Sequence, residues 1–182
     1  MIDPGHGGYD SGAVGFLGAK EKDITLQVAL KLGKLLEAKN IKIIYTRTSD
    51  KVSWSSNEKL GLKARTEISN NANADYYVSI HCNYVDDKNV NGTETYYFNG
   101  STHGKALADS IQKELIKSTE LSDRGIKEAD YYVLRHTAAP AILTELGFIS
   151  NEREEKNLSD PAYQDKIASA LCDGIMNDIN KR

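Results

Sequence analysis

The sequence predicts a single α/β domain with a largely parallel sheet. Its 182 residues suffice for one domain with a sizeable hydrophobic core. Short apolar runs typical of buried strands alternate with longer segments whose apolar residues recur at helical spacing. Such alternation indicates parallel strands joined by helices. The chain has no internal repeat and no low-complexity linker that would divide it into two domains.

The first half of the chain is expected to begin with a short strand and to alternate helix and strand after it. Met1 to Asp3 form the stub of that strand, and apolar residues of 24–39 share one helical face. The remaining predicted segments are a strand at 41–46, a polar loop with Trp54 at 47–59, and a helix at 60–71.

The second half is expected to contain the central strands. The run "YYVSIHC" at 76–82 is apolar enough for a buried strand, whereas 93–98 alternates and indicates an edge or antiparallel strand. Helices are predicted at 103–118 and 162–180, and further strands at 131–134 and 141–145.

Charge and composition exclude several classes of partner. The net charge of −3 provides no basic surface for nucleic acid. No apolar run approaches the roughly 20 residues of a membrane span, and the polar, glycine-rich start does not resemble a signal peptide. Cys82 and Cys172 are too few for a disulfide scaffold.

Three ionisable residues are predicted to lie at the carboxyl ends of strands, where ligands bind in open α/β sheets. His6 follows the first strand, His81 ends the strand at 76–82, and Glu145 ends the strand at 141–145. Such groups are costly to bury unless they are paired or bind a metal. A bound metal would satisfy all three, while an ion pair of Glu145 with Arg135 or Arg65 is the structural alternative for that residue.

The residue types at these positions suit zinc, which binds imidazole nitrogen and carboxylate oxygen. A catalytic zinc keeps three protein ligands and an open position for water. Glu21 closes the glycine-rich loop that carries His6 and is a candidate carboxylate ligand. Asp10 or Asp23 is the alternative at this position, and an exposed charge is the structural alternative for Glu21.

Other catalytic motifs are absent from the sequence. It contains no H-E-x-x-H, phosphate-binding P-loop or G-x-S-x-G motif, and Asp10 replaces the third glycine of a dinucleotide-binding loop. Because neighbouring strand residues face opposite sides, Cys82 is expected to pack under a helix, away from His81. Asn83 is expected on the same side as His81.

Several separated motifs resemble the zinc-dependent N-acetylmuramoyl-L-alanine amidases of the Amidase_3 type. They are "DPGHGG", "KEKD", "LKAR", "ANADYYVSIHCN", "GTETYYF" and "YYVLRHTAAPAILTELGFISN", in this order, followed by an amphipathic helix. The resemblance covers essentially the whole chain, 1–182. It implies a mixed six-stranded sheet flanked by helices, one zinc ion bound by His6, Glu21 and His81, and Glu145 as the catalytic carboxylate.

The resemblance also implies the substrate, bacterial peptidoglycan, and cleavage of its amide bond between N-acetylmuramic acid and L-alanine. Asn83 and Arg65 are candidates for substrate contact. The expected location is the cell wall or the extracellular space, with a cell-wall-binding domain elsewhere in the full-length protein. A zinc carboxypeptidase acting on the stem peptide and a non-catalytic wall-binding module are the alternatives, and the presence of Glu145 argues against the second.

Overall fold

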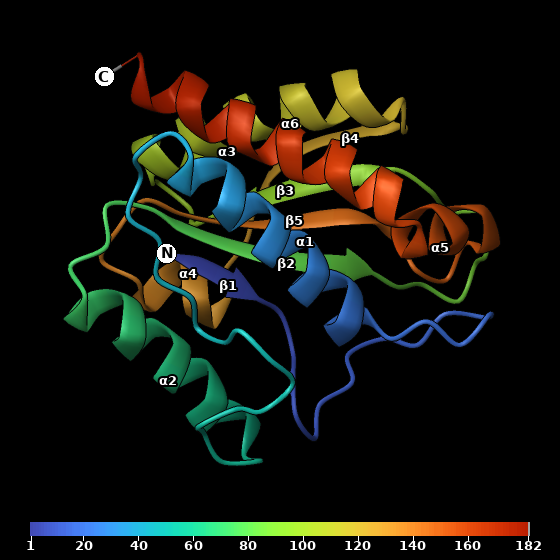
Figure 1. The fold of residues 1–182 in the computed structure, drawn as a ribbon, viewed down its shortest axis with the longest axis horizontal. Coiled ribbons are helices and arrows are strands. Elements are labelled where there is room, and N and C mark those ends of the chain that lie inside the picture. Colours follow the sequence, from blue (N-terminus) through green and yellow to red (C-terminus); the bar gives the residue numbers. More distant parts are fainter. Residues whose placement is uncertain (182) are drawn as a thin grey trace.

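A computed structural model describes residues 1–181 as a single α/β domain built on one five-stranded sheet (Figure 1). The strand order is β1-β2-β5-β3-β4, and only the β3–β5 pair is antiparallel. The sheet is therefore mixed and mostly parallel, as predicted. The strands are β1 (Ile2–Pro4), β2 (Tyr77–Asn83), β3 (Thr93–Tyr97), β4 (Asp123–Glu128) and β5 (Ala141–Phe148).

Helices cover both faces of the sheet. One face carries α1 (Glu21–Glu37), α3 (Thr102–Thr119) and α6 (Pro161–Ile179), and the other carries α2 (Glu58–Asn71) and α4 (Tyr132–His136) (Figure 1). The short helix α5 (Glu152–Ser159) follows β5. No helix within residues 1–181 is both long and apolar enough to span a membrane.

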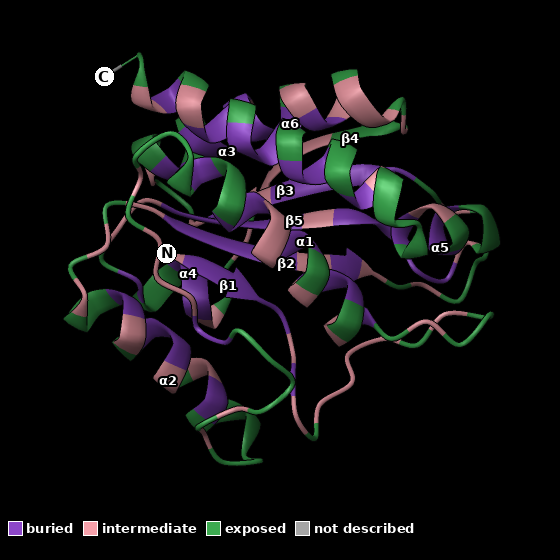
Figure 2. Ribbon diagram, viewed as in Figure 1, coloured by how far each residue is buried: buried purple, intermediate pink, exposed green. Residues whose placement is uncertain are grey.

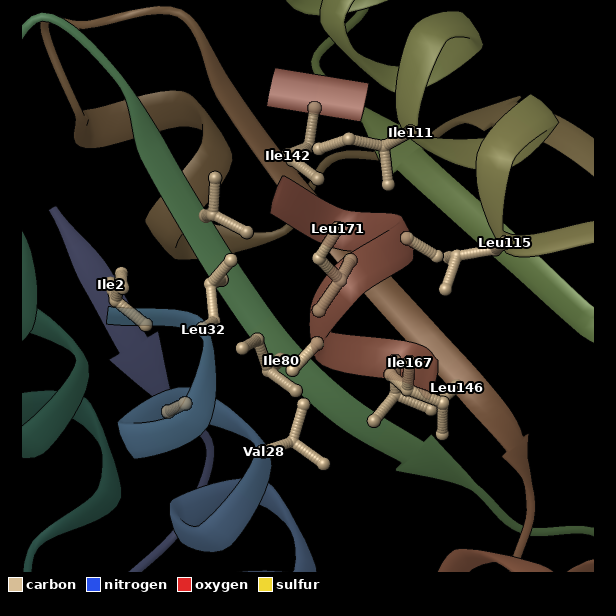
Figure 3. Close-up of a cluster of buried hydrophobic side chains, with 14 of the residues drawn as sticks. Ile2, Val28, Leu32, Ile80, Ile111, Leu115, Ile142, Leu146, Ile167 and Leu171 are labelled. Carbon is tan, nitrogen blue, oxygen red and sulfur yellow. The ribbon is translucent and has the colours of Figure 1, made fainter. Parts of the chain in front are cut away.

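The main hydrophobic core lies between the sheet and the helices α1, α3 and α6 (Figure 3). Apolar residues at helical spacing, such as Val28 and Leu32 of α1, are fully buried there. They meet alternate residues of β2, including Ile80 and Cys82, so the predicted packing of Cys82 is confirmed. Figure 2 shows how burial follows the strands and the inward sides of these helices.

The opposite face of the sheet is smaller and more polar. A second cluster of apolar residues, Tyr77, Val133, Leu134, Ala141 and Leu143, packs there. Because side chains alternate along a strand, Ser79, His81 and Asn83 of β2 lie on this face with Tyr77. The α2/α4 face is therefore the one that holds the predicted site.

Two predicted strands are wrong, and the sheet has five strands where six were expected. The segment 41–46 makes only a single bridge, between Tyr45 and Ile2, because β1 offers just three residues for pairing. The segment 131–134 lies at the start of α4, where the adjacent residues Val133 and Leu134 are both buried. Burial of successive residues suits a helix against an apolar cluster better than a strand with alternating faces.

Two elements were not predicted. β4 consists mostly of exposed and half-buried polar residues, as expected of an edge strand, and therefore carries no apolar signal. α5 is only eight residues long and strongly charged. The segment 93–98 was expected to be an edge strand or an antiparallel strand. It forms β3, which is antiparallel to β5 but lies inside the sheet and not at its edge.

Candidate metal centre

The glycine-rich loop brings His6 close to the end of β2. His6 has a left-handed backbone conformation with φ of 61°, and Gly7 and Gly12 also have positive φ. The loop folds back on itself through a pair of hydrogen bonds between Gly7 and Asp10. A Cβ atom on Gly5 would lie 2.4 Å from Cε1 of His81, and one on Gly12 would lie 2.6 Å from Oε2 of Glu21. These glycines therefore leave room for the functional side chains.

Substitution Gly5→Ala is expected to displace the His81 ring, because its Cβ would overlap all three ring atoms nearest to it. We expect metal content to fall, because His81 is a candidate ligand, and any catalytic rate that depends on His81 to fall by at least tenfold, since a misplacement of about 1 Å can cost 10²-fold in rate. Metal analysis of the purified variant and a cleavage assay measure the two effects. Normal metal content in Gly5→Ala would show that His81 has room to move.

His6, Glu21 and His81 converge near the carboxyl end of β2, where Glu21 approaches from the start of α1. Oε1 of Glu21 lies 3.0 Å from Nε2 of His6 and 3.0 Å from Nδ1 of His81. One ligand atom from each residue lies within 4.8 Å of the others. The two imidazole rings meet edge to face, with centroids 4.9 Å apart.

Further contacts orient these three side chains. Nδ1 of His6 lies 2.7 Å from Oδ2 of Asp10, which leaves Nε2 directed at Glu21. The backbone N–H groups of Cys82 and Ala13 donate to the two carboxylate oxygens of Glu21, each at 2.9 Å. Burial raises the pKa of Glu21, but the hydrogen bonds of both histidines hold it well below its usual range. Glu21 is therefore anionic.

This donor set fits a zinc ion. Tetrahedral ligands at about 2.1 Å from zinc lie roughly 3.4 Å apart, and the separations of 3.0 Å from Glu21 to each histidine are close to this value. Among residues 1–181, these three form the group suited to hold a metal. The alternatives to Glu21 lie outside it, since Asp10 contacts the far nitrogen of His6 and Asp23 is exposed on α1.

Glu145 lies beside this group because of strand register. It is the direct neighbour of His81 across the parallel β2–β5 pair. Its Oε2 atom is buried and has no hydrogen-bond partner among the described residues. Burial raises the pKa of Glu145 well above its usual range, and the charges of Glu21 and Glu94 raise it further. Glu145 is thus a half-buried residue with one carboxyl oxygen shielded from solvent, and its side chain lies on the same face of the sheet as that of His81.

The structural alternative for Glu145 does not occur among the described residues. Arg135 pairs with Asp130, and Arg65 pairs with Asp3. No contact between Glu145 and either arginine is formed in residues 1–181. Among the described residues, neither arginine therefore neutralises the carboxyl group of Glu145.

Arg65 is buried in α2 and supports the loop that carries His6. Its Nη1 donates to Oδ1 of Asp3 at 2.5 Å and its Nη2 donates to the backbone oxygen of His6 at 2.6 Å. The guanidinium carbon lies 4.5 Å from the ring centre of Trp54. A surface salt bridge, one of the interpretations of Arg65, is thereby wrong. Its contact with substrate stays a prediction.

Substitution Arg65→Met is expected to lower the free energy of unfolding by about 3–5 kcal/mol, because it leaves the Asp3 carboxylate buried without its cation. Urea denaturation measures the loss. Lys63→Met on the same helix is the control, since Lys63 is exposed and its one ion pair among residues 1–181 is with Glu67. Equal stabilities of the two variants would mean that the buried pair contributes nothing.

Asp3 gives the fold an acid-sensitive element. Burial raises its pKa, but Arg65 and the hydroxyl groups of Thr46, Tyr77 and Ser79 hold it well below its usual range. The unfolded chain therefore binds more protons than the folded one below pH of about 4, and stability is lost as pH falls through this range. We expect the unfolding free energy of the parent chain to decline more steeply between pH 5 and 2 than that of Asp3→Asn, by about 2 kcal/mol. If the unfolding free energies of the parent chain and of Asp3→Asn fall equally steeply with pH, Asp3 is not the source of the acid sensitivity.

Asn83 lies at the end of β2 and donates through Nδ2 to Oε1 of Glu94 at 2.8 Å. Glu94 is buried and is the direct neighbour of Glu145 across the β3–β5 pair. The proposed contact of Asn83 with substrate stays a prediction. Sequence reasoning did not single out Glu94, although the alternation in "TETYYF" places it on the same face as Tyr96.

A cavity of about 260 Å³ adjoins the histidines between α2 and α4. Its walls include Trp54, Tyr131 and Leu143, and both His6 and His81 reach it. Charged side chains, among them Asp10, Glu58 and Arg65, line the cavity together with these aromatic and apolar residues. Two residues of the candidate metal group, His6 and His81, therefore border a hollow of ligand size.

Residues 1–177 match the Amidase_3 family, N-acetylmuramoyl-L-alanine amidase. The chain is 35% identical to N-acetylmuramoyl-L-alanine amidase LytC of Bacillus subtilis over 179 residues, which cover 97% of the chain and 34% of LytC. It is 34% identical to the germination-specific N-acetylmuramoyl-L-alanine amidase of the same organism, with 96% and 77% covered. The chain thus spans about a third of the length of LytC.

Solved structures agree with this assignment. The CwlD amidase from Clostridioides difficile, solved in complex with the GerS lipoprotein, superposes with a TM-score of 0.94 at 36% identity, covering 100% of this chain and 98% of that one. The catalytic domain of CwlV from Bacillus (Paenibacillus) polymyxa gives 0.90 at 37% identity, with 100% and 97% covered. The chain belongs to the Amidase_3 family of N-acetylmuramoyl-L-alanine amidases.

Proposed function

We propose that the chain hydrolyses the amide bond between N-acetylmuramic acid and L-alanine in bacterial peptidoglycan and binds one zinc ion for this reaction. The observation that carries the proposal is the convergence of His6, Glu21 and His81 beside the carboxyl group of Glu145, whose Oε2 atom is buried, in a chain that belongs to this amidase family. Peptidoglycan is accordingly the proposed substrate.

His6, Glu21 and His81 would hold the zinc ion through Nε2, Oε1 and Nδ1. When bound, zinc supplies an acidified water and polarises the scissile carbonyl group. Asp10 fixes the imidazole of His6 in the tautomer whose Nε2 is free to bind. The N–H groups of Ala13 and Cys82 hold the carboxylate of Glu21 in place.

Glu145 would act as the general base and then as the general acid. Its carboxylate accepts a proton from the attacking water and donates it to the nitrogen of the departing L-alanine. A carboxyl group whose pKa is raised by burial is suited to this task, because it holds the proton more tightly before transfer. The neighbouring cavity would take up the part of the substrate next to the bond, where Arg65 and Asn83 are the proposed contacts.

Mass spectrometry of digested peptidoglycan tests the proposal, with Glu145→Ala protein run in parallel. We expect stem peptides with a free L-alanine amino terminus from the parent chain and none from the variant. Shortened stems still attached to sugar would instead show a carboxypeptidase. Wall binding without any soluble product would show a binding module.

The proposed location is the cell wall or the extracellular space. One relative, 36% identical over 96% of this chain, is named a probable cell wall amidase of Staphylococcus aureus. Because the chain covers only 34% of LytC, we also propose that a cell-wall-binding domain accompanies the catalytic domain in the full-length protein.

A further inference from the structure

Two cations lie on the α2/α4 face beyond Glu145, held by the buried carboxylate of Glu94. Nε of Arg124 donates to Oε2 of Glu94 at 2.9 Å, and Nζ of Lys127 donates to the same oxygen at 2.5 Å. Glu94 is only 3% exposed, whereas the side chains of Arg124 and Lys127 are 36% and 39% exposed. We call Arg124 and Lys127 the cation pair.

Strand register places the cation pair in line with the catalytic group. His81 neighbours Glu145 across β2–β5, and Glu145 neighbours Glu94 across β5–β3. Neighbouring strands are about 4.8 Å apart. The cation pair, which belongs to the adjacent strand β4, therefore lies within about two strand spacings of Glu145. The aromatic cavity lies on the other side, over Asp3 and Ser79 of β1 and β2.

The cation pair places two positive charges on Glu94, and the charge of Arg124 also acts on the carboxylate of Glu154. Asn83 and the hydroxyl group of Tyr96 also donate to Oε1 of Glu94, so its carboxylate has four donors. A carboxylate has about four acceptor sites, and one cation would balance its charge. Within residues 1–181 only Nε of the Arg124 guanidinium donates a hydrogen bond, so its two Nη groups remain for a ligand.

We propose that the cation pair binds the free α-carboxylate of the glutamate at the second position of the stem peptide, an inference that rests on the proposed function. One extended residue spans about 3.5 Å, so this carboxylate lies roughly 6–7 Å beyond the scissile nitrogen. The charged ends of Arg124 and Lys127 contact Glu94, which is one strand spacing of about 4.8 Å from Glu145, so a reach of about 6–7 Å from a bond held beside Glu145 extends to them. Arginine binds carboxylates through paired N–H groups, and Glu94 holds Arg124 in a fixed orientation.

The inference also orients the substrate. The stem peptide crosses β5 and β3 toward the cation pair, and the sugar lies toward the cavity walled by Trp54 and Tyr131. Substrates in which the α-carboxylate is converted to a carboxamide lose the charge that the cation pair recognises. The cation pair therefore makes the enzyme selective for the acidic form of peptidoglycan.

Two synthetic substrates test this directly: N-acetylmuramoyl-L-alanyl-γ-D-glutamyl-L-lysine with a free α-carboxylate, and the same molecule with an α-carboxamide. We expect the parent chain to cleave the carboxylate form with a kcat/KM about tenfold higher, the value of one charge-assisted hydrogen bond. The double variant Arg124→Gln plus Lys127→Gln should lose this preference. Because the double variant leaves the buried carboxylate of Glu94 without both of its cations, circular dichroism and thermal unfolding show whether it is folded, and the ratio of kcat/KM for the two substrates within the same variant is the readout.

Lys105→Gln is the matched control, because Lys105 is exposed on α3, on the opposite face of the sheet. It should keep the preference of the parent chain. Equal cleavage of both substrates by the parent chain would overturn the inference while leaving the proposed function intact, as would an unchanged preference in the double variant. An equal loss on both substrates would assign the cation pair a structural role. Failure of the parent chain to cleave either substrate would overturn the proposed function itself.

Discussion

Substitution Glu145→Gln is expected to reduce kcat by about 10³-fold or more while leaving the metal content unchanged. Glutamine keeps the size of the side chain but neither accepts nor donates the proton that the reaction moves, and general acid–base catalysis contributes about 10²–10⁴-fold. The buried Oε2 of Glu145 has no protein partner in the described chain. Loss of the carboxylate should therefore affect chemistry and leave the fold in place.

The measurement combines a cleavage assay with metal analysis by inductively coupled plasma mass spectrometry. Glu67→Gln is the control, because Glu67 is exposed on α2 and, in the part of the chain that the structure describes, its ion pair is with Lys63. It should retain full activity. Substantial cleavage by Glu145→Gln, or a loss of metal from it, would remove Glu145 from the catalytic role and make it a ligand or a structural residue.

Substitution His81→Ala is expected to abolish both metal binding and cleavage, and His6→Ala should do the same. Loss of a group that only orients a ligand typically costs 10–100-fold in metal affinity, so loss of a ligand itself should cost more than 100-fold. The carboxylate of Glu21 would then keep a single histidine near Oε1. A competition assay with a zinc chelator measures the affinity.

Two further variants serve as references for the loss of zinc affinity, one with an intermediate effect and one with none. Asp10→Asn removes the charge that orients His6 through Nδ1 and should show the smaller, 10–100-fold loss of affinity. His103→Ala removes an exposed histidine in the first turn of α3 and should bind zinc normally. Zinc affinity retained by His81→Ala would contradict the assignment of the metal centre.

Most of the helices and the central strands could be predicted from local pattern. The strong 3.6-residue periodicity of 24–39 and 162–180 identified α1 and α6, because each buries one continuous apolar row. The segment 131–134 misled prediction, since its Tyr-Tyr-Val-Leu sequence suits a strand. Only its position over Tyr77 and Leu143, where successive side chains are buried together, makes it helical.

The sequence alone determined which residues could form a metal centre and where each would lie: His6 and His81 after strands, Glu145 at the end of another, all at the same edge of a parallel sheet. Those positions follow from local periodicity and from the geometry common to such sheets. Which carboxylate lies between the histidines was left open by the sequence, and the tertiary structure places Glu21 there, while Asp10 contacts the other nitrogen of His6 and Asp23 is exposed. The contact joins residues 60 positions apart, so it depends on how α1 begins against the end of β2.

Contacts between residues far apart in the sequence also explain why the surroundings of Arg65, Glu94 and the cation pair could not be predicted. The sequence is compatible with Arg65 on the surface or in the interior. It is buried because it pairs with Asp3, which is 62 positions away in the sequence. Strand register places Glu94 beside Glu145. Arg124 and Lys127 belong to an edge strand, β4, whose sequence has no apolar pattern from which it could be predicted. Local sequence specifies periodicity and turn chemistry, whereas the pairing of distant charged groups is set by the packing of the whole chain.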